Sequence, residues 1–260
     1  MPTDPQIEKL RVYPVKSLDG VEVDVADVRA NGTLAHDREF ALFDANGNVL
    51  NAKRDERLHA ITADYDPEAR VLTVDAPSAT PTQFDLVHDA EAAEAWFSDA
   101  FDEPVTIRRD TDRGMPDRPK LGLSVVSTAT IRTVASWFDE LTVEGTRRRL
   151  RTNVEVSGVP AFWEDRLVGD DAPAFEVGGH RFEGAIPCGR CVVPGRDPDT
   201  GEPLPKFRKR FIEKRRETVP EWVNEDAFDH WFALTTITRL EESPTDGTIR
   251  VGDSVTLREE

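Results

Sequence analysis

The amino-acid sequence predicts a β-rich α+β protein built from two β-rich units with a few helices. Apolar and polar residues alternate with a period of two in residues 10–16 and 21–30, the pattern of half-buried strands. Turn-forming dipeptides separate short apolar runs, and Asn46-Gly47 is the clearest hairpin signal. Strands and helices do not alternate regularly, so a parallel sheet covered by helices is not expected.

The N-terminal half predicts a small β-barrel followed by a helix. Residues 39–50 indicate a hairpin around Asn46-Gly47, and residues 58–77 indicate another around Asp66-Pro67. Several short strands at this spacing favour a barrel. Residues 89–103 change to helical periodicity, with Asp89 as the N-cap and an apolar face of Ala93, Trp96, Phe97, Ala100 and Phe101.

The polar stretch 108–120 contains Pro and Gly and is interpreted as a linker or mobile loop. The expected domains are therefore residues 1–118, including the helix at 89–103, and residues 119–260. In the second domain a helix is expected over 127–141 and a short basic helix over 204–217, which points Leu204, Phe207 and Phe211 inward. The strands expected there cover residues 153–158, 175–184, 231–242 and 248–257.

Composition limits the partners and the compartment. The net charge is −17, from 50 acidic and 33 basic residues, which argues against nucleic acid because phosphate binding needs a basic face. Only seven of the basic residues are lysines. An acidic, lysine-poor surface is typical of a halophilic protein, because the Debye length falls to about 3 Å at molar salt and self-repulsion is screened. An ordinary acidic protein is the alternative interpretation.

No apolar stretch approaches the roughly 20 residues of a membrane span. The first ten residues have neither the basic start nor the apolar centre of a signal peptide. We therefore expect a cytoplasmic protein that does not interact with a membrane.

Cys188 and Cys191, the only two cysteines, form a Cys-Gly-Arg-Cys motif. Two cysteines and five scattered histidines support a zinc site poorly, and an iron–sulfur cluster needs four ligands. A thioredoxin-like site needs a helix after the motif, which the prolines of the next stretch, Pro194, Pro198 and Pro203, forbid. A thiolate ligand at the end of a strand, favoured by the charge of Arg190, remains. Two small buried apolar residues are the alternative.

Five separated segments carry a resemblance to a known family: residues 12–20 (VYPVKSLDG), 34–47, 149–169, 187–202 (PCGRCVVPGRDPDTGE) and 249–257. In this order they resemble the MOSC superfamily, the molybdenum-cofactor sulfurase C-terminal domains. The chain is similar above all to two-part members that include amidoxime- and N-hydroxylamine-reducing molybdenum enzymes. The resemblance implies an N-terminal MOSC-type β-barrel domain and a MOSC β-barrel domain with a few flanking helices. Thr152 departs from the family, which usually has Pro there.

The resemblance implies a molybdenum cofactor, a pyranopterin whose dithiolene holds the metal. Cys191 is the implied metal ligand, and Cys188 is a neighbour of unassigned role. The implied cofactor-binding residues are Lys16, Ser17 and Arg38 at the pterin phosphate, Arg151 and Asn153 at the pterin, and Arg190 beside the thiolate. For Lys16 and Arg38 the alternative is solvated surface charge. Ser127 is expected to bind from a helix N-terminus, where free N–H groups favour anions, with a plain helix cap as the alternative.

The implied reaction is reduction of an N–O bond, in which R–NHOH, two electrons and two protons give R–NH₂ and water. Cys191 and Asp165 are the expected catalytic residues. Asp165 follows Glu164 beside Phe162-Trp163, where a carboxyl of raised pKa could deliver a proton. A solvated loop acid is the alternative for both carboxylates. The substrate is expected to be a small N-hydroxylated compound.

A separate electron donor, ferredoxin- or reductase-like, is expected because the chain has no cysteines for an iron–sulfur cluster and no Gly-rich dinucleotide fingerprint. Its expected docking surface contains Lys206, Arg208, Lys209, Arg210, Lys214, Arg215 and Arg216. A solvated helix face is the alternative.

The alternative function is a cofactor or sulfur carrier without turnover, whose cysteine bears a persulfide. No pyridoxal-phosphate-dependent desulfurase accompanies this domain, which argues against it. A thiol–disulfide oxidoreductase is the third interpretation.

Overall fold

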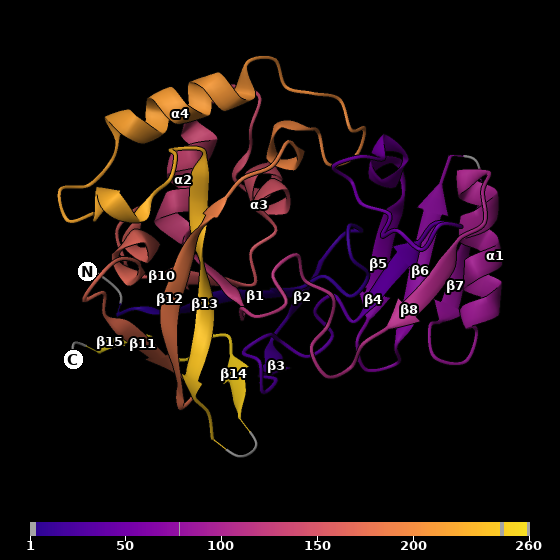
Figure 1. The fold of residues 1–260 in the computed structure, drawn as a ribbon, viewed down its shortest axis with the longest axis horizontal. Helices are drawn as coiled ribbons and strands as arrows, with labels where there is room; N and C mark the ends of the chain where they lie inside the picture. Colours follow the sequence, from indigo (N-terminus) through magenta and orange to yellow (C-terminus); the bar gives the residue numbers. More distant parts are fainter. Residues whose placement is uncertain (1–3, 78, 245–246, 259–260) are drawn as a thin grey trace.

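A computed structural model describes residues 4–77, 79–244 and 247–258 of the chain. The chain forms two lobes, one with helices α2, α3 and α4 around a large sheet and one with helix α1 beside smaller sheets (Figure 1). This confirms the β-rich α+β fold class. Within the described residues no helix has the length and apolar character needed to cross a membrane.

An eight-stranded sheet forms the larger lobe within the described residues, in the order β15-β11-β12-β13-β9-β10-β1-β2. Neighbouring strands are antiparallel except for β9 and β10, which pair parallel. The strand bounds are β1 (Gln6–Val12), β2 (Val21–Val23), β9 (Ser124–Ser127), β10 (Val154–Ser157), β11 (Ala174–Val177), β12 (His180–Gly189), β13 (Ala233–Glu242) and β15 (Thr256–Arg258).

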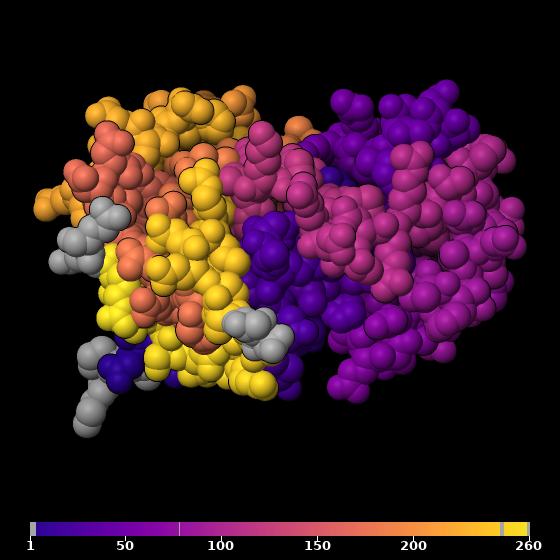
Figure 2. Space-filling view, turned by 60° about the horizontal axis from the view of Figure 1, so that its bottom comes forward, coloured from indigo at the N-terminus to yellow at the C-terminus, as the bar shows by residue number. Residues whose placement is uncertain are grey.

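The sheet crosses the expected domain boundary. Strands β1 and β2 come from the first domain in sequence, yet β1 pairs with β10 of the second, and β3 (Val25–Asp27) pairs with β14 (Thr248–Arg250). Ile7 and Leu10 are fully buried in the same core as Phe175 and Phe182. Figure 2 shows the indigo N-terminal segment between the two lobes. The division at 118/119 falls in a connection between strands, but it does not divide the sheets.

The smaller lobe packs a three-stranded sheet, the strand pair β4-β8 and helix α1 around one apolar core. Its elements are β4 (Phe40–Phe43), η1 (Glu56–Ala60), β5 (Thr62–Asp66), β6 (Val71–Ala76), β7 (Ala79–Asp85), α1 (Ala90–Phe101) and β8 (Thr106–Arg109). Both expected hairpin turns are present, with Gly47 at φ 76° in the first. The sequence patterns missed β7, an edge strand that contains Pro81.

The helices of the larger lobe cover the sheet and are α2 (Thr128–Ser136), α3 (Val143–Leu150), α4 (Phe207–Glu217) and the short helices η2 (Trp163–Leu167), η3 (Val193–Gly195) and η4 (Glu225–Ala227). Helix α4 buries Phe207 and Phe211 against Trp137 and Phe138, as its apolar spacing predicts. Helix α2 ends five residues before the predicted end. Helix α3 was missed because it contributes few apolar side chains to the core.

Candidate functional site

A cavity of about 590 Å³ lies where the two lobes meet, and both contribute to its wall. The smaller lobe and the loops before it supply Lys16, Ser17, Arg38 and His59, among others. The larger lobe supplies Arg151, Asn153 and the loop with both cysteines. Since these segments are far apart in sequence, the tertiary structure alone brings them together.

Cations dominate the wall of this cavity. Among the described residues, three carboxylates line it, and nine cationic side chains do: Lys16, Arg38, Lys53, Arg118, Arg148, Arg149, Arg151, Arg190 and Arg196. This is a local reversal of sign in a chain of net charge −17. A concave site with many convergent guanidinium and ammonium groups favours a ligand that carries several negative charges.

The two cysteines lie at the end of β12, on the strand-to-loop edge expected from the sequence. Both thiols are free, half-buried and part of the cavity wall. Arg190 donates from Nη1 to Cys188 Sγ at 3.3 Å and from Nη2 to the Leu150 carbonyl oxygen at 2.7 Å. The charged contact therefore goes to Cys188, whereas the resemblance assigns the metal to Cys191.

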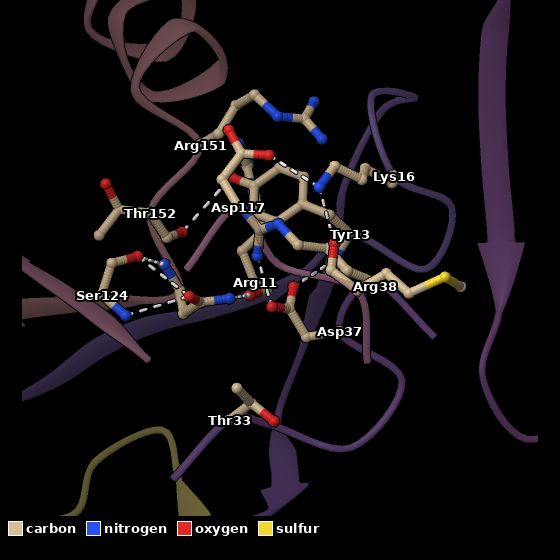
Figure 3. A network of polar contacts seen from close by, with 12 residues as sticks. Arg11, Tyr13, Lys16, Thr33, Asp37, Arg38, Asp117, Ser124, Arg151 and Thr152 are labelled. Carbon is tan, nitrogen blue, oxygen red and sulfur yellow. Dashed lines mark hydrogen bonds and ion pairs between the residues drawn. The ribbon is translucent and has the colours of Figure 1, made fainter. Parts of the chain in front are cut away.

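Tyr13 organises two of the expected cations (Figure 3). Its buried ring lies 4.9 Å from the Arg38 guanidinium carbon and 4.2 Å from that of Arg151. Both arginines have left-handed backbone, with φ of 50° and 54°, and Ser17 has a φ of 77°. Such strained residues persist where the surrounding structure holds them, as in ligand sites. Arg151 also donates to the Leu18 carbonyl oxygen at 2.7 Å, which ties the end of α3 to the Lys16 loop.

Burial and neighbouring charges shift the pKa values of the residues around Tyr13 in opposite directions. Burial lowers the pKa of Arg151 and raises the pKa of Tyr13. Arg38 forms an ion pair with Asp37, whose other oxygen accepts the Tyr13 backbone N–H at 3.0 Å. Arg151 has no carboxylate partner within the described part of the chain, so its charge is available to a ligand.

Lys16 is held by a segment expected to be a linker. Its ammonium donates to the Met115 carbonyl oxygen at 2.8 Å and to Asp117 at 2.7 Å, and Lys53 also pairs with Asp117. Burial opposes ionisation of Asp117, but hydrogen bonds from the two lysines outweigh burial and hold the pKa of its carboxyl far below its usual range. The segment 108–120 begins within β8, connects it to β9, and lines the cavity with Pro116, Asp117 and Arg118.

Asn153 lines the cavity, but its amide is engaged inside the protein. Its Oδ1 accepts from the Ser124 backbone N–H at 3.1 Å and from the Ser124 hydroxyl at 3.0 Å. Its Nδ2 donates to the Arg11 carbonyl oxygen at 3.2 Å. Asn153 thus joins β9 to β1 beneath the cavity.

Ser127 does not line the cavity, so the cofactor-binding expectation for it is wrong. Its side chain is fully buried and accepts the Thr130 backbone N–H at 2.9 Å, and its own N–H donates to Glu164 Oε2 at 3.1 Å. These are the contacts of a helix N-cap, the alternative that the sequence left open.

Asp165 is also absent from the cavity, which removes the proton-donor role expected for it. It is buried and forms an ion pair with Arg215 of α4, a side chain of 0% exposure. Burial and the charge of Asp165 raise the pKa of the adjacent Glu164 to about 8, so Glu164 is the protonated member of the pair at neutral pH. Asp165 belongs to the interface between η2 and α4, whereas the Glu164 carboxyl accepts from the Ser127 N–H and the Thr130 hydroxyl at the start of α2. The alternative, a solvated loop acid, is therefore not observed for either carboxyl.

Helix α4 presents most of its cations outward, away from the cavity. Arg208, Lys209, Arg210 and Arg216 are exposed, while Arg215 is buried and cannot contribute to a docking surface. Lys209 pairs with Glu213 at 3.8 Å.

Sequence reasoning missed part of the cavity wall. Arg148 and Arg149 belong to the unpredicted helix α3, although the run Arg147 to Arg149 was a visible signal. Thr235 of β13 lines the cavity with a φ of 70°, unusual for a β-branched residue, and its buried hydroxyl has no partner within the described residues. No sequence pattern indicated this strained position.

Two family models match the chain: the MOSC N-terminal beta barrel domain over residues 4–103 and the MOSC domain over residues 114–256. The chain is 26% identical to human mitochondrial amidoxime-reducing component 1, over 96% of this chain and 82% of the relative. It is 26% identical to a molybdenum cofactor sulfurase of Solanum lycopersicum, over 75% of this chain and 29% of the relative. A solved structure, the YUAD protein from Bacillus subtilis, aligns at 14% identity over 99% of this chain and 97% of its own, with a TM-score of 0.44. Because the MOSC model alone matches more than half of the chain, the protein belongs to the MOSC family, with the MOSC N-terminal β-barrel domain before the MOSC domain.

Proposed function

We propose that this protein is a molybdenum-cofactor-dependent oxidoreductase that reduces the N–O bond of small N-hydroxylated compounds. The observation that carries the proposal is the cavity, where two free thiols and nine cationic side chains of the described residues converge. Relatives named amidoxime-reducing components support it. A high-salt cytoplasm is the proposed setting, in keeping with the charge of −17.

The residues of the cavity fit such a cofactor. Within the described residues no group of three or more His, Cys, Asp or Glu side chains could hold a metal ion, so a metal here needs ligands that it brings with it. A thiolate is a suitable protein ligand for a soft or high-valent metal. The buried Nε of Arg190 lacks a partner among the described residues, as expected beside a cavity made for an anionic group.

We assign the binding roles by position in the cavity wall. Cys191 would ligate the metal, Lys16 and Arg38 would bind the phosphate, and Arg151 would contact the pterin. When bound, the cofactor supplies two-electron chemistry coupled to removal of an oxygen atom. The protein's part is to hold these groups: Tyr13 packs against the two arginines, and Arg190 contacts the Cys188 sulfur beside the expected metal ligand.

Electrons would come from a separate acidic protein donor that docks on the exposed cations of α4. Charge complementarity supports this choice, because these cations stand out on a protein of strongly negative net charge. Arg210 covers the Phe138 ring, with its guanidinium carbon 5.4 Å from the ring centroid, and Phe138 belongs to the aromatic core of the lobe that holds the cysteines.

The test is purification of the protein followed by elemental and pterin analysis and a turnover assay. We expect one molybdenum per chain and reduction of benzamidoxime with reduced methyl viologen as electron source. A protein without molybdenum that bears a cyanide-labile sulfur on Cys191 would instead support a sulfur or cofactor carrier, the function that the sulfurase relatives favour. Neither molybdenum nor labile sulfur would contradict both proposals.

A further inference from the structure

His59 is the histidine that lines the cavity, and the other four histidines, all within the described residues, do not. It belongs to η1, whose N-cap Asp55 accepts the Arg57 backbone N–H. The side chain is half-buried, so it contacts both the protein and the cavity. With Asp165 excluded from the cavity, His59 is a titratable group placed to exchange protons with a ligand there.

Two contacts fix the orientation of the imidazole ring. Its Nε2 lies 3.3 Å from the Ala52 carbonyl oxygen, which makes Nε2 the protonated nitrogen in the neutral ring and leaves Nδ1 as an acceptor. Nδ1 has no partner within the described part of the chain. Gly201, at φ 73°, packs on the other side, where an added Cβ would lie 3.2 Å from the His59 Cβ and 3.3 Å from Cδ2.

The loop that presses on His59 is the one that carries Cys191. It runs from the cysteines through η3 to Gly201, and Arg196 within it donates to Glu56 of η1 at 3.2 Å. Figure 1 shows this orange loop reaching the violet segment that contains η1. The loop that carries the expected metal ligand therefore also packs against the imidazole, at Gly201.

The pKa of His59 depends on the charges around it, including those of any ligand in the cavity. Burial lowers its pKa, the hydrogen bond to Ala52 opposes this, and Arg196 and Arg151 lower it further, while Asp197 acts in the opposite direction. Of the facing cations, Arg196 is paired with Glu56 and Arg151 has no carboxylate partner. An anion in the cavity would offset these positive charges and so raise the pKa of the imidazole.

We infer that protonated His59 donates its Nδ1 proton to the hydroxyl group that leaves the N-hydroxylated substrate. This role rests on the proposed function. The N–O bond of R–NHOH breaks, the hydroxyl takes the His59 proton and departs as water, and the nitrogen takes a second proton from solvent. The two electrons come from the reduced protein donor or, in the assay, from reduced methyl viologen. His59 then regains its proton from water at the cavity mouth.

The first test measures the titration of the histidines of the wild-type protein by nuclear magnetic resonance, with labelled imidazole rings. We expect inorganic phosphate to raise the pKa of His59 by about one unit, because it offsets the nearby guanidinium charges. His88, 78% exposed and outside the cavity, is the internal control and should not respond. A pKa of His59 that is the same with and without phosphate overturns the inference, whether or not any variant folds.

The second test compares H59Q with the control H88Q. We expect H59Q to keep the molybdenum content of the wild type and to have a kcat about 100-fold lower. Its activity should no longer decrease with rising pH, because that decrease reflects deprotonation of a general acid. H88Q should match the wild type. If H59Q turns over like the wild type with the same pH profile, the role of His59 is refuted while the proposed function stands. If the wild type holds no molybdenum and reduces no N–O bond, the proposed function fails, and this role fails with it.

Discussion

The buried ion pair between Asp165 and Arg215 gives a stability prediction whose size follows from the structure. Arg215 reaches from α4 to η2 with 0% of its side chain exposed, and Asp165 has 2% exposed. The guanidinium carbon also lies 4.2 Å from the Phe162 ring centroid. Substitution of Arg215 by Met keeps much of the side-chain volume and removes the charge, so it leaves a carboxylate buried without a cation.

The folded variant can avoid this buried charge by protonating Asp165, which limits the loss of stability. Protonation at pH 7 of a group whose unfolded pKa is about 3.9 costs about 4 kcal/mol, at 1.36 kcal/mol for each pH unit. This agrees with the roughly 3–5 kcal/mol expected when one partner of a buried pair is removed. Because burial already raises the pKa of Asp165 to about 6 in the wild type, we expect R215M to lower the free energy of unfolding by about 1 to 4 kcal/mol at pH 7.

The pH dependence of the stability loss in R215M identifies its cause. In R215M the folded state holds a proton on Asp165 that the unfolded chain releases above about pH 3.9. Burial raises the pKa of Asp165 to about 6 in the wild type as well, so stability relative to the wild type falls as pH rises through about 6. The deficit should be small at pH 5.5, where Asp165 is largely protonated in both proteins, and should grow toward pH 7. Urea unfolding at both pH values and one fixed salt concentration measures it.

Two control variants separate charge from packing. R216M removes a neighbouring exposed cation and should change stability by less than about 0.5 kcal/mol. The double variant D165N/R215M has no carboxylate to protonate, so it should recover most of the loss at pH 7 and have little extra pH dependence. A deficit in R215M that is equal at pH 5.5 and pH 7 would refute the reasoning and leave lost packing as the cause.

Three further predictions concern the cavity and the proposed docking surface on α4. C191S should lose bound molybdenum in elemental analysis while C188S retains it, and the reverse result would move the ligand role to the thiol that Arg190 contacts. D117N should bind inorganic phosphate about tenfold more tightly in calorimetry, because it frees two lysines from a carboxylate, and equal or weaker binding would contradict this. Charge reversal in K209E/R210E should slow turnover with the protein donor and leave molybdenum content and viologen-driven turnover unchanged, whereas unaltered donor-driven turnover would exclude docking on α4.

Local sequence patterns predicted the elements whose signals lie within a few residues. The turn at Asn46-Gly47, the apolar face of α1 and the inward Phe207 and Phe211 follow from periodicity and turn chemistry, and the structure confirms them. The same logic failed for α3, because a helix with so few apolar residues has no hydrophobic period to detect. It also failed to show that β1 pairs with β10, since strand partners distant in sequence leave no local pattern.

The residues of the candidate site were likewise predicted only in part. The resemblance predicted Lys16, Arg38, Arg151 and both cysteines, and the structure brings them into one cavity. Local sequence reasoning also indicated Asp165, but sequence spacing cannot show whether an acid in a turn faces a cavity or an opposing helix. In this fold Arg215 of α4 takes that acid as its partner.

The sequence by itself determined the fold class, the family resemblance, the scarcity of thiols and the strongly negative charge, because each depends on residue identity and short-range order. Only the tertiary structure decided where the few basic residues gather, which carboxylates they neutralise and that His59 joins the wall shared with the cysteines. The physical reason is that charges and imidazoles act through distance and burial. Both quantities are set when segments from the two lobes pack against each other, and no stretch of the chain encodes them alone.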